Sequence, residues 1–247
     1  MKDSTTLTAL ASVTKKDSDP YYFYKGEYYA SAAAKTCYDT EGYLFDDGDF
    51  IVPGTTYWFK CEPIVWNVVS SADGVYSLLA QDAIDGSIFD ESSNNYKDSD
   101  IRSFLSKDFF SNAFAFGSTS ILEQEVDNSK TSGSKENKDT NPYFCDNTTD
   151  KLYIPSYQEI DALSEGRTAT TTDWARCRSC PCARSAESNA GIMMKDEFDS
   201  TSNYWTRSPD ACGKTYGWVI SEDGHGLHFG SVDIVRGVRP GMKITLA

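Results

Sequence analysis

Histidine is scarce in this sequence, with only His225 and His228 among 247 residues. No nucleophile stands near either histidine, and the chain contains no Gly-x-Ser-x-Gly elbow, phosphate-binding glycine loop or zinc-protease helix. A general base without a partnered nucleophile has no mechanism, so we expect both histidines to have structural or ligand-contacting roles. Carboxylate pairs of glycosidases meet only in space and leave no local motif, so that enzyme class stays open.

Positive charge and long apolar runs are also lacking. The chain carries 23 Lys and Arg against 37 Asp and Glu, a formal net charge of −14. Binding to nucleic acid or to an anionic membrane surface needs a basic footprint, so we exclude both as partners. No apolar run is long enough to cross a bilayer, which predicts no membrane insertion. The first six residues do not resemble a secretory signal; if a leader has been removed, a cell-surface or extracellular location is favoured.

The seven cysteines do not form a recognisable metal motif. Structural zinc sites use two separated ligand pairs, whereas only Cys212 follows the cluster of Cys177, Cys180 and Cys182. We therefore expect free thiols or a disulfide there, and free thiols at Cys37, Cys61 and Cys145. No cofactor is predicted, with zinc at the cysteine cluster as one alternative. Calcium is the other, with the ligands Asp146, Asn147 and Asp150.

Composition predicts one folded unit. A hydrophobic fraction of 39% and an aromatic fraction of 13% suffice for a full core and favour strands over a helical bundle. Residues 1–19 are polar and predict a weakly ordered arm, followed by a single domain over residues 20–247. A Ser, Asn, Asp and Lys segment without apolar periodicity predicts a flexible insertion at about residues 128–142.

Local signals place several elements. Alternating residues over 57–69 and the run 75–80 flank an Asp-Gly turn, which predicts a hairpin of core strands with Pro63 at an edge or bulge. Helix starts are indicated by a cap at Ser99, by the capping box of Ser156 and Glu159, and by Thr172.

Several motifs jointly resemble those of a known family. They are Tyr57-Trp58-Phe59-Lys60 with Glu62-Pro63-Ile64-Val65-Trp66, Asn94 to Arg102, Val126 to Ser129, Thr172 to Ala175, Trp205-x-Arg207-Ser208-Pro209 and Gly237-Val238-Arg239-Pro240. Together they are similar to a bacterial domain of unknown function related to the formylglycine-generating-enzyme type of C-type lectin fold. The resemblance implies a single α+β domain of antiparallel sheets flanked by two main helices, with a loop-rich half that faces a ligand. The cysteines do not match that enzyme's catalytic pattern, so its activity is not transferred.

Members of this wider fold resemble the variable proteins of diversity-generating retroelements, in which miscopied adenines randomise asparagine codons. The resemblance implies that varied positions exclude Lys, Gln, Glu, Met and Trp. The segment Arg176 to Ser185 contains none of these five residue types. Alternate positions after His225 show a similar pattern, as if every second side chain of a strand faced a ligand.

The sequence therefore predicts a non-enzymatic binding protein for a protein or glycan ligand. Its predicted contacts lie in three segments, 176–185, 210–216 and 225–236: Arg176, Arg178, Ser179, Pro181, Arg184, Asp210, Tyr216, His225, Leu227, His228, Phe229, Ser231, Asp233 and Val235. Trp205, Trp218, Val238 and Ile244 are predicted to form supporting core. Arg207 and Arg239 are predicted to tie loops to carbonyls or acids. A carbohydrate-binding module and an enzyme of this fold that uses Cys or His are the alternatives.

Overall fold

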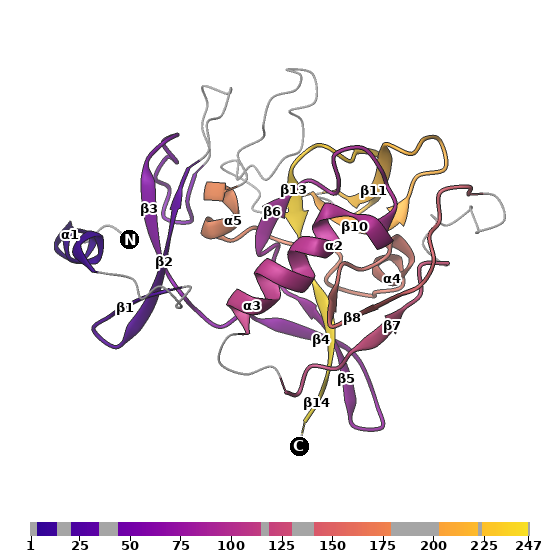
Figure 1. Cartoon of the computed structure of the whole chain (residues 1–247), viewed down its shortest axis with the longest axis horizontal. Helices are drawn as coiled ribbons and strands as arrows, with labels where there is room; N and C mark the ends of the chain where they lie inside the picture. Colours follow the sequence, from indigo (N-terminus) through magenta and orange to yellow (C-terminus); the bar gives the residue numbers. More distant parts are fainter. Residues whose placement is uncertain are drawn as a thin grey trace.

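The computed structural model describes residues 4–13, 21–34, 44–114, 119–129, 141–178, 203–221 and 224–246. Strands dominate, the sheets are mainly antiparallel and the helices are short, so the predicted α+β class is confirmed (Figure 1). Instead of two main helices, the described residues form five α-helical segments of nine residues or fewer.

A small N-terminal sheet lies beside the rest of the chain (Figure 1). It consists of β1 (Tyr22–Tyr24), β2 (Glu27–Ala33) and β3 (Thr56–Lys60), in the order β1-β2-β3 with antiparallel pairing. The turn between β1 and β2 has positive φ at Lys25 and Gly26, which is the tight hairpin geometry that matches strand twist.

A four-stranded sheet has the order β4-β5-β14-β9. Its strands are β4 (Trp66–Ala72), β5 (Val75–Ala80), β14 (Gly241–Thr245) and β9 (Leu152–Tyr153). The β4–β5 hairpin and its Asp73-Gly74 turn are confirmed, because both turn residues have positive φ. β14 comes late in the chain and occupies an interior position, between β5 and β9.

The prediction of one continuous strand over residues 57–69 is wrong. β3 and β4 belong to two different sheets, and the segment around Pro63 connects them without strand structure. Proline lacks the amide hydrogen that a ladder needs, which favours a break at this point. β4 is also more exposed than a core strand, with Val68 60% exposed.

A five-stranded sheet has the order β12-β11-β10-β13-β6. Its strands are β12 (Gly226–Ser231), β11 (Tyr216–Ile220), β10 (Tyr204–Pro209), β13 (Arg236–Val238) and β6 (Asp85–Ser87). All its pairs are antiparallel except β10 with β13. β7 (Gln124–Val126) and β8 (Thr148–Asp150) form a separate pair.

The predicted helix starts are confirmed. Ser99 caps α2 (Asp100–Phe104) by accepting a hydrogen bond from the Arg102 amide, and α2 continues through a π-helical segment, η2 (Leu105–Phe109), into α3 (Phe110–Ala113). Ser156 and Glu159 form a complete capping box at α4 (Tyr157–Asp161). A short 3₁₀ turn, η1 (Tyr96–Asp98), precedes α2, and α5 (Asp173–Arg178) follows Thr172.

The main core lies between the four-stranded and five-stranded sheets and α2. Trp205 and Val238 are fully buried in it, and Ile244 packs against it while partly buried. These positions confirm the predicted supporting core. Trp218 is partly buried and stacks on Tyr157 of α4, with ring centroids 4.6 Å apart.

Two predicted disordered regions have ordered parts. Residues Ser4–Ser12, expected to be a weakly ordered arm, form helix α1, in which Leu10 is fully buried. The centre of the predicted insertion lies outside the described residues, but its flanks are buried. Asn128 donates a hydrogen bond to the Asp146 carbonyl at 2.9 Å, and Asn141 donates one to the Pro209 carbonyl at 3.0 Å. Burial of both asparagines anchors the ends of this segment to the folded core.

Within the described ranges, no helix has the length and apolar character needed to span a membrane.

Candidate functional site

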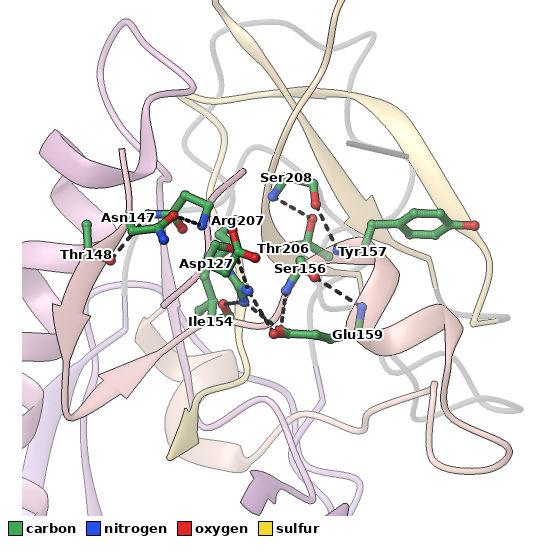
Figure 2. A network of polar contacts seen from close by, with 11 residues as sticks. Asp127, Asn147, Thr148, Ile154, Ser156, Tyr157, Glu159, Thr206, Arg207 and Ser208 are labelled. Atoms are coloured by element: carbon green, nitrogen blue, oxygen red, sulfur yellow. Dashed lines mark hydrogen bonds and ion pairs between the residues drawn. The ribbon is translucent and has the colours of Figure 1, made fainter. Parts of the chain in front are cut away.

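Arg207 of β10 ties three segments of the chain together (Figure 2). Its side chain is 2% exposed. Its guanidinium donates to both carboxylate oxygens of Glu159, at 2.6 and 2.8 Å, and to the Ile154 carbonyl at 3.0 Å. It also lies over the Tyr153 ring. This two-pronged geometry is the one that arginine favours with carboxylates, and it confirms the predicted structural role.

The same contact sets the protonation of Glu159. Burial raises the pKa of this carboxyl, but the hydrogen bonds and the charge of Arg207 outweigh that effect, so its pKa is lowered. Glu159 also accepts a hydrogen bond from the Ser156 amide at 2.9 Å as part of the capping box. The Glu159 carboxylate therefore both caps the N-terminus of α4 and holds α4 against β10.

Arg239 plays a similar structural role behind the five-stranded sheet. It is 1% exposed and donates to the carbonyls of Ala80 and Gly166, each at 2.8 Å, and to the Tyr204 hydroxyl at 3.1 Å. Its bonds to backbone carbonyls confirm the predicted role. The terminal arginine motifs thus belong to the frame and leave ligand contacts to other residues.

The first predicted contact segment is only partly described. Arg176 is 2% exposed, donates to the Thr171 carbonyl at 2.6 Å and forms ion pairs with Asp46 and Asp173. The prediction that Arg176 contacts a ligand at the surface is therefore wrong, because its side chain is buried and already has partners within the protein. Arg178 is partly exposed, bonds Asp85 at 2.5 Å and lies over the Trp174 ring. Ser179, Pro181 and Arg184 lie outside the described residues.

The second and third segments meet at the β11–β12 edge of the sheet, where Tyr216 pairs with Ser231. Tyr216 is 39% exposed, and His225 is exposed at the turn before β12. Asp210 is only 1% exposed and accepts a hydrogen bond from the Cys212 amide, and Val235 is 8% exposed. These two predicted contacts are interior, because they close a turn and fill the core.

The remaining predicted contacts of these segments lie within β12 or just after it. Ser231 donates a hydrogen bond to Asp233 at 2.7 Å, and both side chains are partly exposed. Leu227, His228 and Phe229 lie within β12, and their side chains are outside the described set. β12 is an edge strand of the five-stranded sheet.

Arg236, at the start of β13, differs from the other described arginines. Those others bond to carboxylates or, for Arg239, to carbonyls and a hydroxyl. Arg236 has no such partner in the described ranges; its Nε is buried without a hydrogen bond and its guanidinium carbon lies 5.3 Å from the Trp205 ring centroid. Burial lowers the pKa of Arg236 to about 10. The sequence could not reveal this, because charge compensation depends on packing.

The arrangement divides the predicted face between the two edges of one sheet. Arg178 and Arg236 both lie at the β6–β13 edge, since Arg178 bonds to Asp85 of β6 and Arg236 pairs with Ser87. Tyr216 and His225 lie near the opposite edge, at β11 and β12. The two groups of exposed or partly exposed side chains therefore lie on opposite sides of the central strand β10.

The alternative calcium ligands already have protein partners. Asp150 forms an ion pair with Arg102, Asp146 forms one with Lys97, and Asn147 bonds to Asn128 and Glu125. No grouping of three or more His, Cys, Asp or Glu side chains suited to a metal occurs in the described part of the chain. Cys180 and Cys182 of the zinc alternative lie outside it.

The described thiols allow a test of the cysteine-enzyme alternative. Cys61, Cys145 and Cys177 are free, and burial raises the pKa of Cys61 and of Cys177 to about 11. Because thiolates are the reactive form and both pKa values are high, iodoacetamide at about pH 8 should alkylate partly exposed Cys61 slowly and buried Cys177 more slowly still. Peptide mapping by mass spectrometry over time measures this order. Equal labelling rates for Cys61 and Cys177 would show an activated thiol at Cys177 and contradict the expectation.

Taken together, the fold and this face define an α+β protein with a buried arginine-tied frame and with exposed or partly exposed side chains near two sheet edges. The family model described as "Domain of unknown function (DUF6273)" matches residues 73–246. The chain therefore belongs to this family, and β1, β2 and β3 lie before the matched range. No curated protein and no solved structure matches the chain.

Proposed function

We propose that this is a non-catalytic binding protein, in which a C-type lectin-like frame displays exchangeable side chains at the edges of the five-stranded sheet. The favoured ligand is another protein, because arginine and aromatic side chains are the residues that protein interfaces over-use. Arg178, Arg236, Tyr216 and His225 are the described members of this display. A diversity-generating retroelement would produce the variation in these displayed side chains.

The observation that carries the proposal is the uncompensated charge of Arg236. A partly buried guanidinium without an acid has lost water without gaining a counterion, which costs free energy. A carboxylate on a ligand would provide that counterion with a matching two-pronged geometry. The buried arginines Arg207 and Arg239 instead bond within the protein, as expected when binding groups sit on a rigid support.

Sequencing the same locus across isolates tests the proposal. We expect substitutions to concentrate at Arg178 to Ser185, at Tyr216 and at alternate positions from His225 to Phe229. Trp205, Arg207 and Arg239 should stay constant and serve as the internal control, because they are buried. A segment 176–185 that is identical in all isolates would remove the diversification proposal.

A further inference from the structure

A second surface feature lies away from the two sheet edges. It is a groove of about 1470 Å³ between the N-terminal sheet, α5 and the α2–α3 segment. Ten aromatic side chains line it, including Tyr22, Trp58, Trp66, Phe109, Phe114 and Trp174, and we call it the aromatic groove. This volume exceeds the roughly 300–1000 Å³ of small-molecule pockets. A polymeric ligand fits its size better than a metabolite.

The aromatic groove is formed where the family domain meets the N-terminal sheet. Trp58 and Tyr22 come from before the matched range and contact each other edge to face, with centroids 4.8 Å apart. Trp174 and Phe114 come from within it. Phe59 of β3 bridges the two parts by packing edge to face on Trp174 at 5.4 Å. The groove therefore requires both parts of the chain.

Its charge is predominantly negative. Six carboxylates line it against two cations, Lys60 and Arg178. Asp85 is matched by Arg178, and Asp46 and Asp173 by Arg176 from behind. Glu62 and Asp108 are exposed and form no ion pair within the described ranges. Two exposed carboxylates without an ion pair, beside aromatic rings, therefore favour a cationic ligand over a neutral or acidic one.

The backbone of β3 adds a third element. β3 is an edge strand, with β2 as its neighbour in the described sheet. Trp58, Phe59 and Lys60 of β3 line the groove, together with Cys61 and Glu62, which follow the strand. Consecutive residues of a strand point to opposite faces, so a groove that touches all three reaches the edge of β3 as well as one face of the sheet. A strand edge offers main-chain hydrogen bonds to an extended chain.

We propose that the aromatic groove binds an extended basic peptide segment of a partner protein. Lysine or arginine side chains would stack on the aromatic rings and pair with Glu62 and Asp108, while the peptide backbone adds to the edge of β3. This site is distinct from the display around Arg236, and neither proposal requires the other.

The probe is a fluorescein-labelled octapeptide of alternating lysine and valine, titrated with the full chain at about 0.15 M salt and followed by fluorescence anisotropy. We expect saturable binding, and none of the corresponding glutamate–valine peptide. Binding of a neutral glucose oligosaccharide in its place would overturn the proposal and identify a glycan site.

Matched charge variants separate a groove from a general attraction to an acidic protein. Glu62→Gln with Asp108→Asn should weaken binding about five- to tenfold, as expected for two exposed charge pairs. Glu91→Gln with Glu123→Gln removes two exposed carboxylates outside the groove and should change binding less than twofold. Equal weakening by both pairs would refute a specific site.

Tryptophan emission reports the place of binding. Three of the five tryptophans line the groove, whereas Trp205 is buried and Trp218 stacks on Tyr157. The basic peptide should change the emission, and Trp58→Phe should reduce that change while Trp218→Phe preserves it. The phenylalanine retains a ring against Tyr22, which protects the fold. If Trp218→Phe alone abolished the change in emission, the peptide would bind at the sheet face near Trp218. That outcome would refute binding in the aromatic groove.

Discussion

Replacement of Arg207 by alanine is expected to lower the free energy of unfolding by about 3 kcal/mol, near the low end for breaking a buried ion pair. The substitution removes the bonds to Glu159 and Ile154 and leaves the carbonyl without that donor. The cost stays near the low end because the Glu159 side chain is 48% exposed and water can solvate it. Urea unfolding followed by circular dichroism measures the change.

Arg167→Ala is the matched control. Arg167 also pairs with a carboxylate, Asp161, but both side chains are at least 40% exposed. Exposed pairs contribute about 1 kcal/mol or less, so the control should lose no more than that. If both variants lost equal stability, Arg207 would not be the tie that its burial indicates.

The pH dependence gives an independent readout of the same contact. The pKa of Glu159 is lower in the folded protein than in the unfolded chain, so its pairing stabilises the fold fully above the unfolded value. That contribution is lost as the pH falls through the folded pKa. The difference in unfolding free energy between wild type and Arg207→Ala should therefore shrink from about pH 7 to about pH 3. A constant difference would assign the loss to packing alone.

Gly237→Ala is expected to lower the unfolding free energy by about 2 kcal/mol through overpacking. Gly237 lies in β13, between β10 and β6. An added Cβ would lie 2.9 Å from the Ala83 Cβ and 3.0 Å from the Asn203 carbonyl oxygen, which the backbone must move to accommodate. Thermal and urea unfolding both report the loss. The glycine in the Gly-Val-Arg-Pro motif is thus explained by a close approach of strands.

Gly213→Ala provides the comparison. A Cβ there would meet only the Tyr216 ring, at 3.2 Å, and that ring is 39% exposed and can move. The control should change stability by less than about 0.5 kcal/mol. A Gly237→Ala protein as stable as this control would show that the strands separate at little cost.

Features set by a few neighbouring residues could be predicted from the sequence. The capping box of Ser156 and Glu159 and the turn at Asp73 and Gly74 depend on local geometry, and both are confirmed. The structural roles of Arg207 and Arg239 were also predictable, because arginine within a buried apolar motif needs carbonyl or acid partners.

Features set by distant pairing could not be predicted. The alternation over residues 57–69 does not reveal that β3 joins one sheet and β4 another. Arg176 stands in a run that suggests an exposed loop, yet Asp46, 130 residues earlier, helps to hold it inside. The aromatic groove is similar, since its lining residues come from segments between Tyr21 and Arg178. Such sites depend on which elements the chain brings together.

The interior position of β14 has a consequence for biosynthesis. β5 and β9 both pair with β14, so their facing edges remain open until residues 241–245 have left the ribosome. Pairing of β5 with β14 spans 160 or more residues of chain and is therefore slow. Unpaired strand edges meanwhile promote association between nascent chains. Translation speed and chaperone occupancy should therefore control the yield of this protein more strongly than that of a domain closed by neighbouring hairpins.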